Sequence, residues 1–164
     1  HIDHVIKNGN TYEKNIVLRH PNLTEKHIDH VLKNGTEYEK QLVLSHPNLT
    51  EKHIDHMMEN GTEEHKQEAL RHPKVTEKHI TMGLKSSHPT TRYEAIGDDT
   101  HNKRRPVTKH HIDTAIRDEN SRVRQQAVYH HSTTPDQLTY VMDNDPDPFV
   151  RQITASIHQK RKRE

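Results

Sequence analysis

The chain has 164 residues, of which 25 are Lys or Arg, 24 are Asp or Glu, 27% are hydrophobic and none is Cys. Without cysteine the sequence can form no disulfide, no thiolate metal site and no cysteine nucleophile. The near balance of charge gives only weak support to a nucleic-acid partner, because proteins that neutralise many phosphates usually carry a large positive excess. No apolar run reaches the roughly 20 residues of a membrane span, so we expect no membrane partner and a cytoplasmic, intracellular location.

The chain contains an internal repeat of 26 residues, with one longer interval, and each copy is marked by an apolar residue. The marker residues are Ile2, Ile28, Ile54, Ile80, Ile112 and Leu138. Such a period is typical of solenoids, in which stacked neighbours form the core that one unit cannot form alone. We therefore predict an all-α fold, a single α-solenoid domain of about six short two-helix repeats. The predicted repeats span residues 1–22, 23–48, 49–74, 75–106, 107–132 and 133–164.

The first half of each copy carries the signals of one short helix. In the second copy Thr24 is a predicted N-cap, and Ile28 lies on the apolar face that follows it. Gly35 is expected to end this helix in the left-handed conformation. Gly9 and Gly61 repeat the signal in the neighbouring copies. The same pattern therefore predicts the first helix of every repeat.

The second half of each copy predicts another helix. In the second copy Thr36 and Glu39 form a capping-box pattern at its start. Val43 and Leu44 are the expected buried pair, and equivalent apolar pairs follow in the other copies. Pro47 closes the segment, because proline cannot continue a helix. Helices this short are marginal alone, so packing between copies must supply their stability.

The fourth copy carries six extra residues within the segment 97–106. We expect a polar loop at one edge of the repeat. Insertions in solenoids often lie on the binding side, which makes Lys103, Arg104 and Arg105 candidates for contact with a partner. The favoured alternative is a tolerated mobile insertion, because lengthening a surface loop costs little free energy.

The last two copies read IRDENSRVRQQAVYHHSTTPDQL and MDNDPDPFVRQITASIH, with an acidic turn, Val-Arg, a small apolar pair and Thr-Pro. This pattern, within residues 115–157, resembles the leucine-rich repeat variant family. The resemblance implies a right-handed superhelix of alternating short helices, related to HEAT-type solenoids, in which the Val-Arg position helps to stack the repeats. The iron–sulfur cysteines of that family are absent here, so the resemblance implies no cluster.

Basic residues recur at one position of the second helix. They are Lys14, Lys40, Lys66, Arg92, Arg124 and Arg151, the last one place later than the others. One interpretation is a ridge of cations, ~10 Å apart, that follows a phosphate backbone. We favour the alternative in which each cation pairs with an acid of the next copy, for example Asp29, Asp55 or Asp113. Aromatic residues for base stacking are also scarce.

The 18 histidines form a second repeated feature. His27 and His30 lie three residues apart on one helix and could chelate a divalent metal, but the same motif occurs in three copies, and a catalytic metal site is rarely triplicated. We favour surface positions, or packing at the third residue of the helix, and expect no metal site. Stacked histidines could also make stability or binding respond to pH, although a mere compositional habit is the preferred interpretation.

We therefore expect a non-enzymatic scaffold that binds another macromolecule, with a protein as the favoured partner and no cofactor. No phosphate-binding glycine loop, nucleophile elbow or isolated carboxylate pair is visible. The candidate binding residues are Arg92, Lys103, Arg104, Arg105, Arg124 and Arg151.

Two alternatives stay open. The chain could bind nucleic acid through the basic ridge and the terminal run Lys160–Arg163. It could also be the docking arm of a larger protein or assembly, because it begins at His1 inside a copy of the repeat, which favours upstream residues. The sequence leaves the oligomeric state open.

Overall fold

A computed structural model of the chain describes residues 1–98 and 105–164. The described residues form twelve α-helices and no strand, which confirms the predicted all-α fold. They divide into two compact units, His1–Lys74 and Val75–Glu164, and the division falls at the predicted boundary between the third and fourth repeats. None of the helices in these residues is both long enough and apolar enough to cross a membrane.

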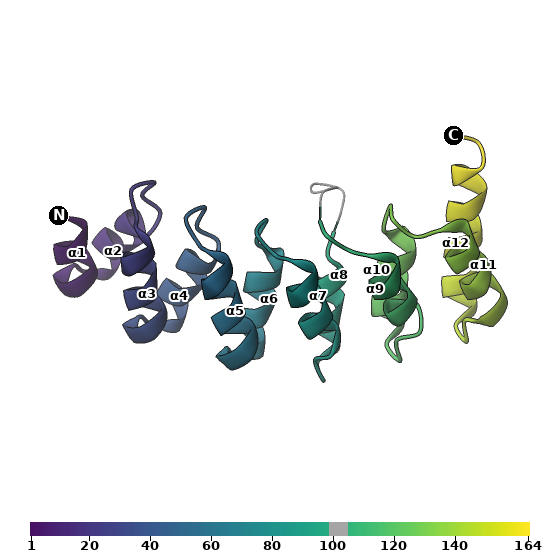
Figure 1. Cartoon of the computed structure of the whole chain (residues 1–164), viewed down its shortest axis with the longest axis horizontal. Coiled ribbons are helices and arrows are strands. Elements are labelled where there is room, and N and C mark those ends of the chain that lie inside the picture. The colour runs from purple at the N-terminus through teal and green to yellow at the C-terminus, as the bar shows by residue number, and fades with distance from the viewer. Residues whose placement is uncertain (99–104) are drawn as a thin grey trace. The chain divides into compact units, whose positions relative to one another are not determined.

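The first unit consists of three consecutive helix pairs. Its helices are α1 (Ile2–Asn8), α2 (Thr11–Val17), α3 (Glu25–Asn34), α4 (Glu37–Leu44), α5 (Glu51–Asn60) and α6 (Glu63–Arg71). The two helices of each pair pack on each other, and the second helices form a row in which α2 packs on α4 and α4 on α6. Figure 1 shows the three pairs in chain order within this unit.

The second unit has the same organisation. Its helices are α7 (Glu77–Leu84), α8 (Pro89–Ile96), α9 (Lys109–Ala115), α10 (Ser121–Tyr129), α11 (Pro135–Asn144) and α12 (Pro148–Arg161). Again each pair packs internally, and α8, α10 and α12 form a row of second helices. Equivalent positions on these helices can therefore be compared directly.

The predicted helix starts at Thr24 and Thr36 are confirmed. The main-chain N–H of Thr36 donates to Oε2 of Glu39 at 3.1 Å, and the N–H of Glu39 donates to Oγ1 of Thr36 at 3.2 Å. In α3 the corresponding third residue is His27, whose Nδ1 accepts the N–H of Thr24 at 2.9 Å. Histidine thus takes the place of glutamate in the capping box of the first helix.

The ends of α3 and α5 differ from the sequence expectation. Gly35 has φ −74° and ψ 164°, and Gly61 has φ −75° and ψ 163°, so both are extended and the predicted left-handed stop is wrong. A Cβ atom at Gly35 would lie 2.6 Å from the main-chain oxygen of Val31. Glycine is therefore required here because the chain passes close to the preceding turn, and not because of its φ angle.

The core follows the predicted register. The predicted apolar pair of each second helix from α2 to α10 is buried; in α4 this pair is Val43 and Leu44. Full burial of one such aliphatic side chain contributes roughly 1.5–3 kcal/mol, which stabilises helices too short to persist alone. Ile2 is partly exposed, and the fully buried marker residues are Ile28, Ile54, Ile80, Ile112 and Leu138.

Candidate interaction surfaces

Arg92 of α8 joins two consecutive helix pairs. Its Nε donates to Oδ2 of Asp118 at 2.7 Å, and its Nη2 donates to Oδ1 of the same residue at 3.0 Å. Its Nη1 donates to the main-chain oxygen of Ser86, in the turn before α8, at 3.0 Å. The hydrogen bond with Asp118 raises the pKa of Arg92. The guanidinium is therefore held on both sides and fixes one pair against the next.

Arg124 of α10 repeats this arrangement one pair later. Its Nε and Nη2 donate to the two carboxylate oxygens of Asp145 at 2.8 and 3.1 Å. Its Nη1 donates to the main-chain oxygen of Asp118 at 2.9 Å. The side chains of Arg124 and Asp145 are 7% and 1% exposed, so this ion pair is buried.

Arg151 of α12 makes only the first half of the same arrangement within the described residues. Its Nη1 donates to the main-chain oxygen of Asp145 at 2.5 Å, as Arg92 and Arg124 do to the equivalent turns. The structure gives its guanidinium no carboxylate among the described residues, and the side chain is partly exposed.

The acids that face these arginines lie in the turn between the two helices of the following pair. Arginine pairing with the next copy was the favoured interpretation of the sequence, and it holds for Arg92 and Arg124. Asp113, one of the acids we expected, instead accepts a hydrogen bond from the side chain of Gln137. The candidate role of these arginines in binding a partner stays a prediction.

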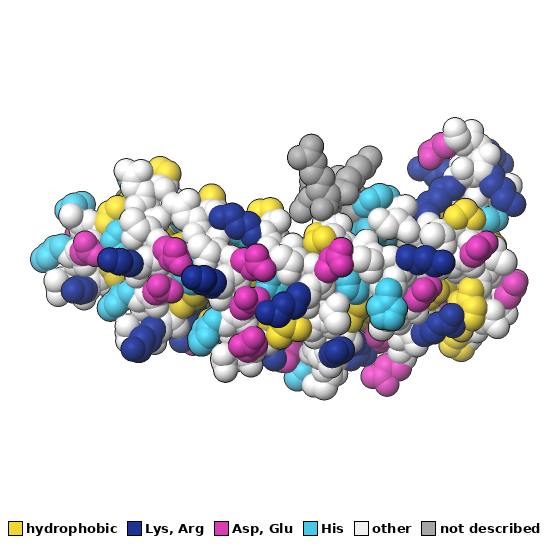
Figure 2. Space-filling model, in the orientation of Figure 1, with side chains coloured by type: hydrophobic (Ala, Val, Ile, Leu, Met, Phe, Trp, Pro, Cys, Tyr) yellow, Lys and Arg dark blue, Asp and Glu magenta, His cyan; other side chains and the backbone are white. Residues whose placement is uncertain are grey.

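The lysines of the ridge form weaker, more exposed pairs. Lys14 Nζ lies 3.4 Å from Glu39 Oε1 of the next pair, whereas Lys40 pairs with Glu37 of its own helix at 3.3 Å. Partly exposed pairs of this kind contribute about 0–1 kcal/mol each. Figure 2 shows basic, acidic and histidine side chains interspersed on the visible side of the first unit.

Arg105, a candidate contact residue, is a buried helix cap. Its Nη2 donates to the main-chain oxygens of Glu94 and Ala95 at 2.7 and 3.0 Å, and its Nε donates to that of Ile96 at 3.1 Å. Burial lowers the pKa of Arg105 to about 10. Gly97, at φ 69°, makes room for the guanidinium, because a Cβ there would lie 2.6 Å from Arg105 Nε. The other two candidates of the insertion, Lys103 and Arg104, lie outside the described residues.

In α3 and α5 the histidine at the third position of the helix links its pair to the one before it. In α3, Nδ1 of His27 accepts the N–H of Thr24, and its Nε2 lies 3.0 Å from Oδ1 of Asp3. In α5, Nε2 of His53 lies 2.9 Å from Oδ1 of Asp29. One ring nitrogen therefore caps its own helix and the other reaches the preceding pair.

Gln137 occupies the same frame in α11 and identifies the tautomer of these histidines. Its Oε1 accepts the N–H of Thr134 at 2.9 Å, and its Nε2 donates to Oδ1 of Asp113 at 2.7 Å. An amide has a fixed acceptor and a fixed donor. A histidine that occupies this position, such as His53, therefore has an unprotonated Nδ1 that accepts a hydrogen bond and a proton on Nε2.

His111 in α9 makes the frame sensitive to pH. Burial lowers the pKa of His111 from 6.5; the nearby charge of Glu77 raises it by less, and that of His110 lowers it slightly further. The unfolded chain then binds this proton more readily, so the contribution to stability is complete above pH 6.5 and is lost as pH falls through the lowered pKa. Protonation would also place an N–H on Nδ1, opposite the N–H of Thr108.

We expect His111→Gln to make stability less dependent on pH. Thermal unfolding at about pH 7.5 and about pH 5 tests this. Nδ1 of His111 accepts the N–H of Thr108, and its Nε2 lies 2.8 Å from Oγ1 of Thr81. The wild type should lose more stability than the variant over this interval, because glutamine can keep both of these hydrogen bonds without titrating, as Gln137 keeps the bonds of its own frame. Equal losses in the two proteins would contradict the expectation.

The hydrogen bonds of these histidine rings leave fewer nitrogens to bind a metal. Both nitrogens of His27 already have partners within the protein. The structure contains, in its described ranges, no group of three or more His, Cys, Asp or Glu residues that could hold a metal ion.

A patch of exposed apolar side chains lies on α2 and α4, and the sequence interpretation missed it. Tyr12, Ile16 and Tyr38 are 74%, 54% and 49% exposed, and Leu42 is partly buried. Each helix contributes an i, i+4 pair, and the two helices pack side by side, so the four side chains share one surface. We call these four residues the tyrosine patch. The signal was present in the sequence as Tyr12 and Tyr38, which are 26 residues apart in the same register.

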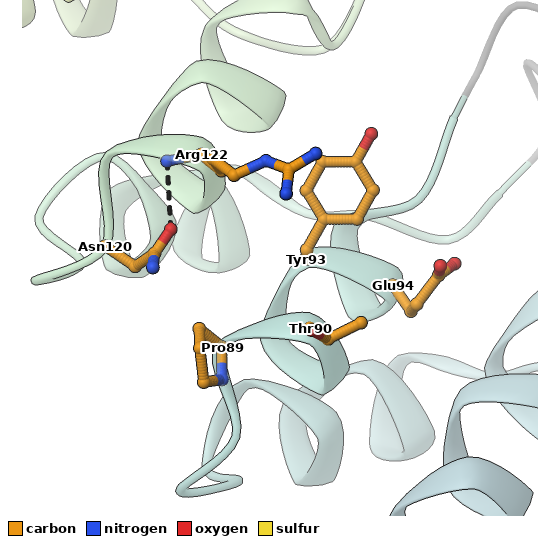
Figure 3. A pocket seen from close by; sticks show the side chains of 6 residues that line it. All are labelled: Pro89, Thr90, Tyr93, Glu94, Asn120 and Arg122. Carbon is orange, nitrogen blue, oxygen red and sulfur yellow. Dashed lines mark hydrogen bonds between the residues drawn. The ribbon is translucent and has the colours of Figure 1, made fainter.

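A small pocket lies between α8 and α10 in the second unit. It has a volume of about 290 Å³ and is lined by Pro89, Thr90, Tyr93, Glu94, Asn120 and Arg122. Figure 3 shows the Tyr93 ring and the Arg122 guanidinium turned toward each other, with the Glu94 carboxylate beyond the ring. Its polar and aromatic lining can accommodate a small side chain.

No protein-family model, curated protein or solved structure matches this chain. The resemblance of residues 115–157 to the leucine-rich repeat variant family therefore stays a prediction.

Proposed function

We propose that the chain is a right-handed α-solenoid of six two-helix repeats that binds another protein, without catalysis, through the tyrosine patch. The recurring register of its polar links supports the repeat count. Asp3–His27, Asp29–His53 and Asp113–Gln137 are each separated by 24 residues. Links of one kind at one separation are expected when equivalent units stack in serial order.

The tyrosine patch carries the proposal of a protein partner. Tyrosine is enriched at the energetic centres of protein interfaces, because its ring supplies apolar area and its hydroxyl a polar contact. Tyr12 and Tyr38 lie in equivalent positions on packed helices, so one partner can contact both. Exposed apolar side chains that gather in this way mark interaction sites more often than isolated ones do.

The geometry gives less support to a nucleic-acid partner at the basic ridge. Arg92 and Arg124 are already engaged by aspartates. Phosphate binding there would have to separate a buried ion pair, which is strongly unfavourable. Lys40 is more accessible, but Glu37 lies 3.3 Å from its amino group.

Capture from a native lysate with Tyr12→Ser/Tyr38→Ser tests the proposal. Both tyrosines are at the surface, so the variant should fold as the wild type does, which circular dichroism can check. We expect the wild type to retain a defined protein that the double variant loses by tenfold or more, because central interface tyrosines each contribute about 2 kcal/mol. Tyr129→Ser, which changes a tyrosine in α10 that is 55% exposed, between Tyr38 and Tyr12, is the matched control.

Parallel samples with and without nuclease separate the two partner classes. Retention that survives nuclease and depends on the tyrosine patch supports the proposal. Retention that disappears with nuclease, or that falls steeply with added salt and is unchanged in the double variant, would assign the function to nucleic-acid binding instead.

A further inference from the structure

The tyrosine patch continues onto α6 as an acidic position. Tyr12, Tyr38 and Glu64 are 26 residues apart, at the same place in the second helices α2, α4 and α6. Glu64 is exposed, and its carboxylate forms no ion pair with any described residue of the chain. These three residues, which we call the second-helix row, therefore present two aromatic rings followed by one carboxylate.

Contacts between neighbouring helices bring the members of the second-helix row close together. Lys14 of α2 reaches Glu39 of α4, with Nζ 3.4 Å from Oε1. His65 of α6 reaches Glu37 of α4, with Nε2 2.7 Å from Oε2. Each of these four residues is adjacent to a member of the row or two places from it. Neighbouring members are therefore about one helix spacing apart, roughly 8–10 Å.

Tyr38 shows that the stacked pairs themselves leave this position open. Its helix, α4, packs on α2 and also on α6, so it has a neighbouring pair on both sides. Tyr38 is nevertheless 49% exposed. Its equivalent Glu64 is exposed as well. A neighbouring repeat does not cover this position, and the second-helix row is therefore a surface that a separate segment can reach.

An unpaired amide accompanies Tyr38 on the same side of α4. Gln41 lies one helical turn after Tyr38 and is exposed. Its side chain has no hydrogen-bond partner in the part of the chain that the structure describes. The amide can donate and accept, and a polyproline II segment offers main-chain groups that are not paired within the segment. A helical partner has already paired most of these groups, so Gln41 favours an extended one.

We propose that the second-helix row binds a polyproline II segment of the form proline-x-x-proline-x-x-basic, in either chain direction. A polyproline II helix places every third residue on one side, about 9 Å apart, which matches the spacing of the row. Residues on one side of a β-strand are only about 7 Å apart. Two prolines then pack on Tyr12 and Tyr38, as proline-rich segments do in aromatic-lined grooves, and the Lys or Arg that follows on the same side meets Glu64.

Peptide binding to the whole chain tests this assignment. The probe is the acetylated, amidated peptide Pro-Ala-Pro-Pro-Ala-Pro-Arg, together with its reverse sequence. We expect the ring resonances of Tyr12 and Tyr38, assigned by their loss in the Tyr→Ser variants, to shift saturably with at least one of the two peptides. The ring resonance of Tyr129 should not move, because this residue lies in the other unit.

Matched peptides and variants test the charge at Glu64. Replacing the arginine of the probe by glutamate should weaken binding about fivefold, because an exposed attraction becomes a repulsion. Glu64→Lys should reverse this order of affinities. Glu51→Lys, which changes an exposed glutamate at the start of α5, is the control and should keep the order of the wild type. The peptide Pro-Ala-Pro-Pro-Ala-Arg-Pro, with the cation turned to another side, should also bind more weakly than the probe.

Three outcomes would overturn the proposal. One is the absence of a saturable shift with either probe up to about 1 mM. Another is equal affinity for the arginine and glutamate peptides in the wild type. The third is tighter binding of a proline-free amphipathic helical peptide than of the probe, which would assign the surface to a helical partner.

This inference rests on the proposed function, because it names the chemistry of the partner of the tyrosine patch. The two can still fail separately. Capture of a protein that depends on Tyr12 and Tyr38, without binding of the proline peptides, would contradict the polyproline II segment and leave the protein partner supported. Binding of the probe without any tyrosine-dependent capture would support the segment chemistry and contradict a partner in that lysate.

Discussion

Asp145→Asn is expected to destabilise the chain by about 3–5 kcal/mol. The side chains of Asp145 and Arg124 are 1% and 7% exposed, and the substitution leaves the guanidinium buried without a counter-charge. Asparagine keeps an oxygen that can accept the N–H of Asp147. The loss of stability therefore measures mainly the ion pair and not the hydrogen bond within the turn. Urea unfolding followed by circular dichroism measures the change.

A double-mutant cycle separates the pair from the rest of the site. Arg124→Met alone should also be costly, because it leaves a buried carboxylate, but Arg124→Met/Asp145→Asn should recover much of the loss. Glu119→Gln is the control for a turn acid outside the core, since Glu119 is 87% exposed and its pair with Arg92 contributes less than about 1 kcal/mol. Strictly additive single effects would contradict a direct coupling.

Arg105→Met is expected to destabilise the chain by about 2–3 kcal/mol. The methionine can fill part of the volume, but its side chain has no N–H group. The last carbonyl groups of α8, including that of Ile96, therefore lose the hydrogen bonds that the guanidinium donates. Urea unfolding again measures the loss.

The control for this effect is Arg122→Met, which removes the same charge from an exposed position in the same unit. It should change stability by less than about 0.5 kcal/mol. If Arg105→Met were as mild as Arg122→Met, Arg105 would not be a structural cap, and its predicted role as a contact residue would gain support.

Local signals were sufficient to predict the helices and the core. Thr24 and Thr36 cap helices because side-chain capping depends on residues only three positions apart. Ile28 and its equivalents are buried because a 26-residue register places them on the same face of every pair. The glycine prediction failed because close packing against a carbonyl, as at Gly35, selects glycine as effectively as a positive φ does.

Contacts between repeats were harder to predict. The sequence shows that Arg124 recurs in register, but which acid it meets depends on how one helix pair is rotated against the next. The partner is Asp145, in a turn, and not an acid on the first helix such as Asp113. The capping role of Arg105 could not be predicted for a related reason, because a polar insertion offers no sign that one of its arginines folds back onto a helix end.

The central claim, that neighbouring repeats stack in serial order, can be tested by crosslinking. The chain has no cysteine, so Asp29→Cys/His53→Cys introduces the only thiols, at positions whose native side chains lie 2.9 Å apart. A short thiol-to-thiol reagent should join them within one molecule. Asp3→Cys/His53→Cys places the thiols two repeats apart, about 20 Å at normal helix spacing, and should not crosslink. Equal crosslinking of both pairs, or crosslinking of the distant pair alone, would contradict the stacked arrangement.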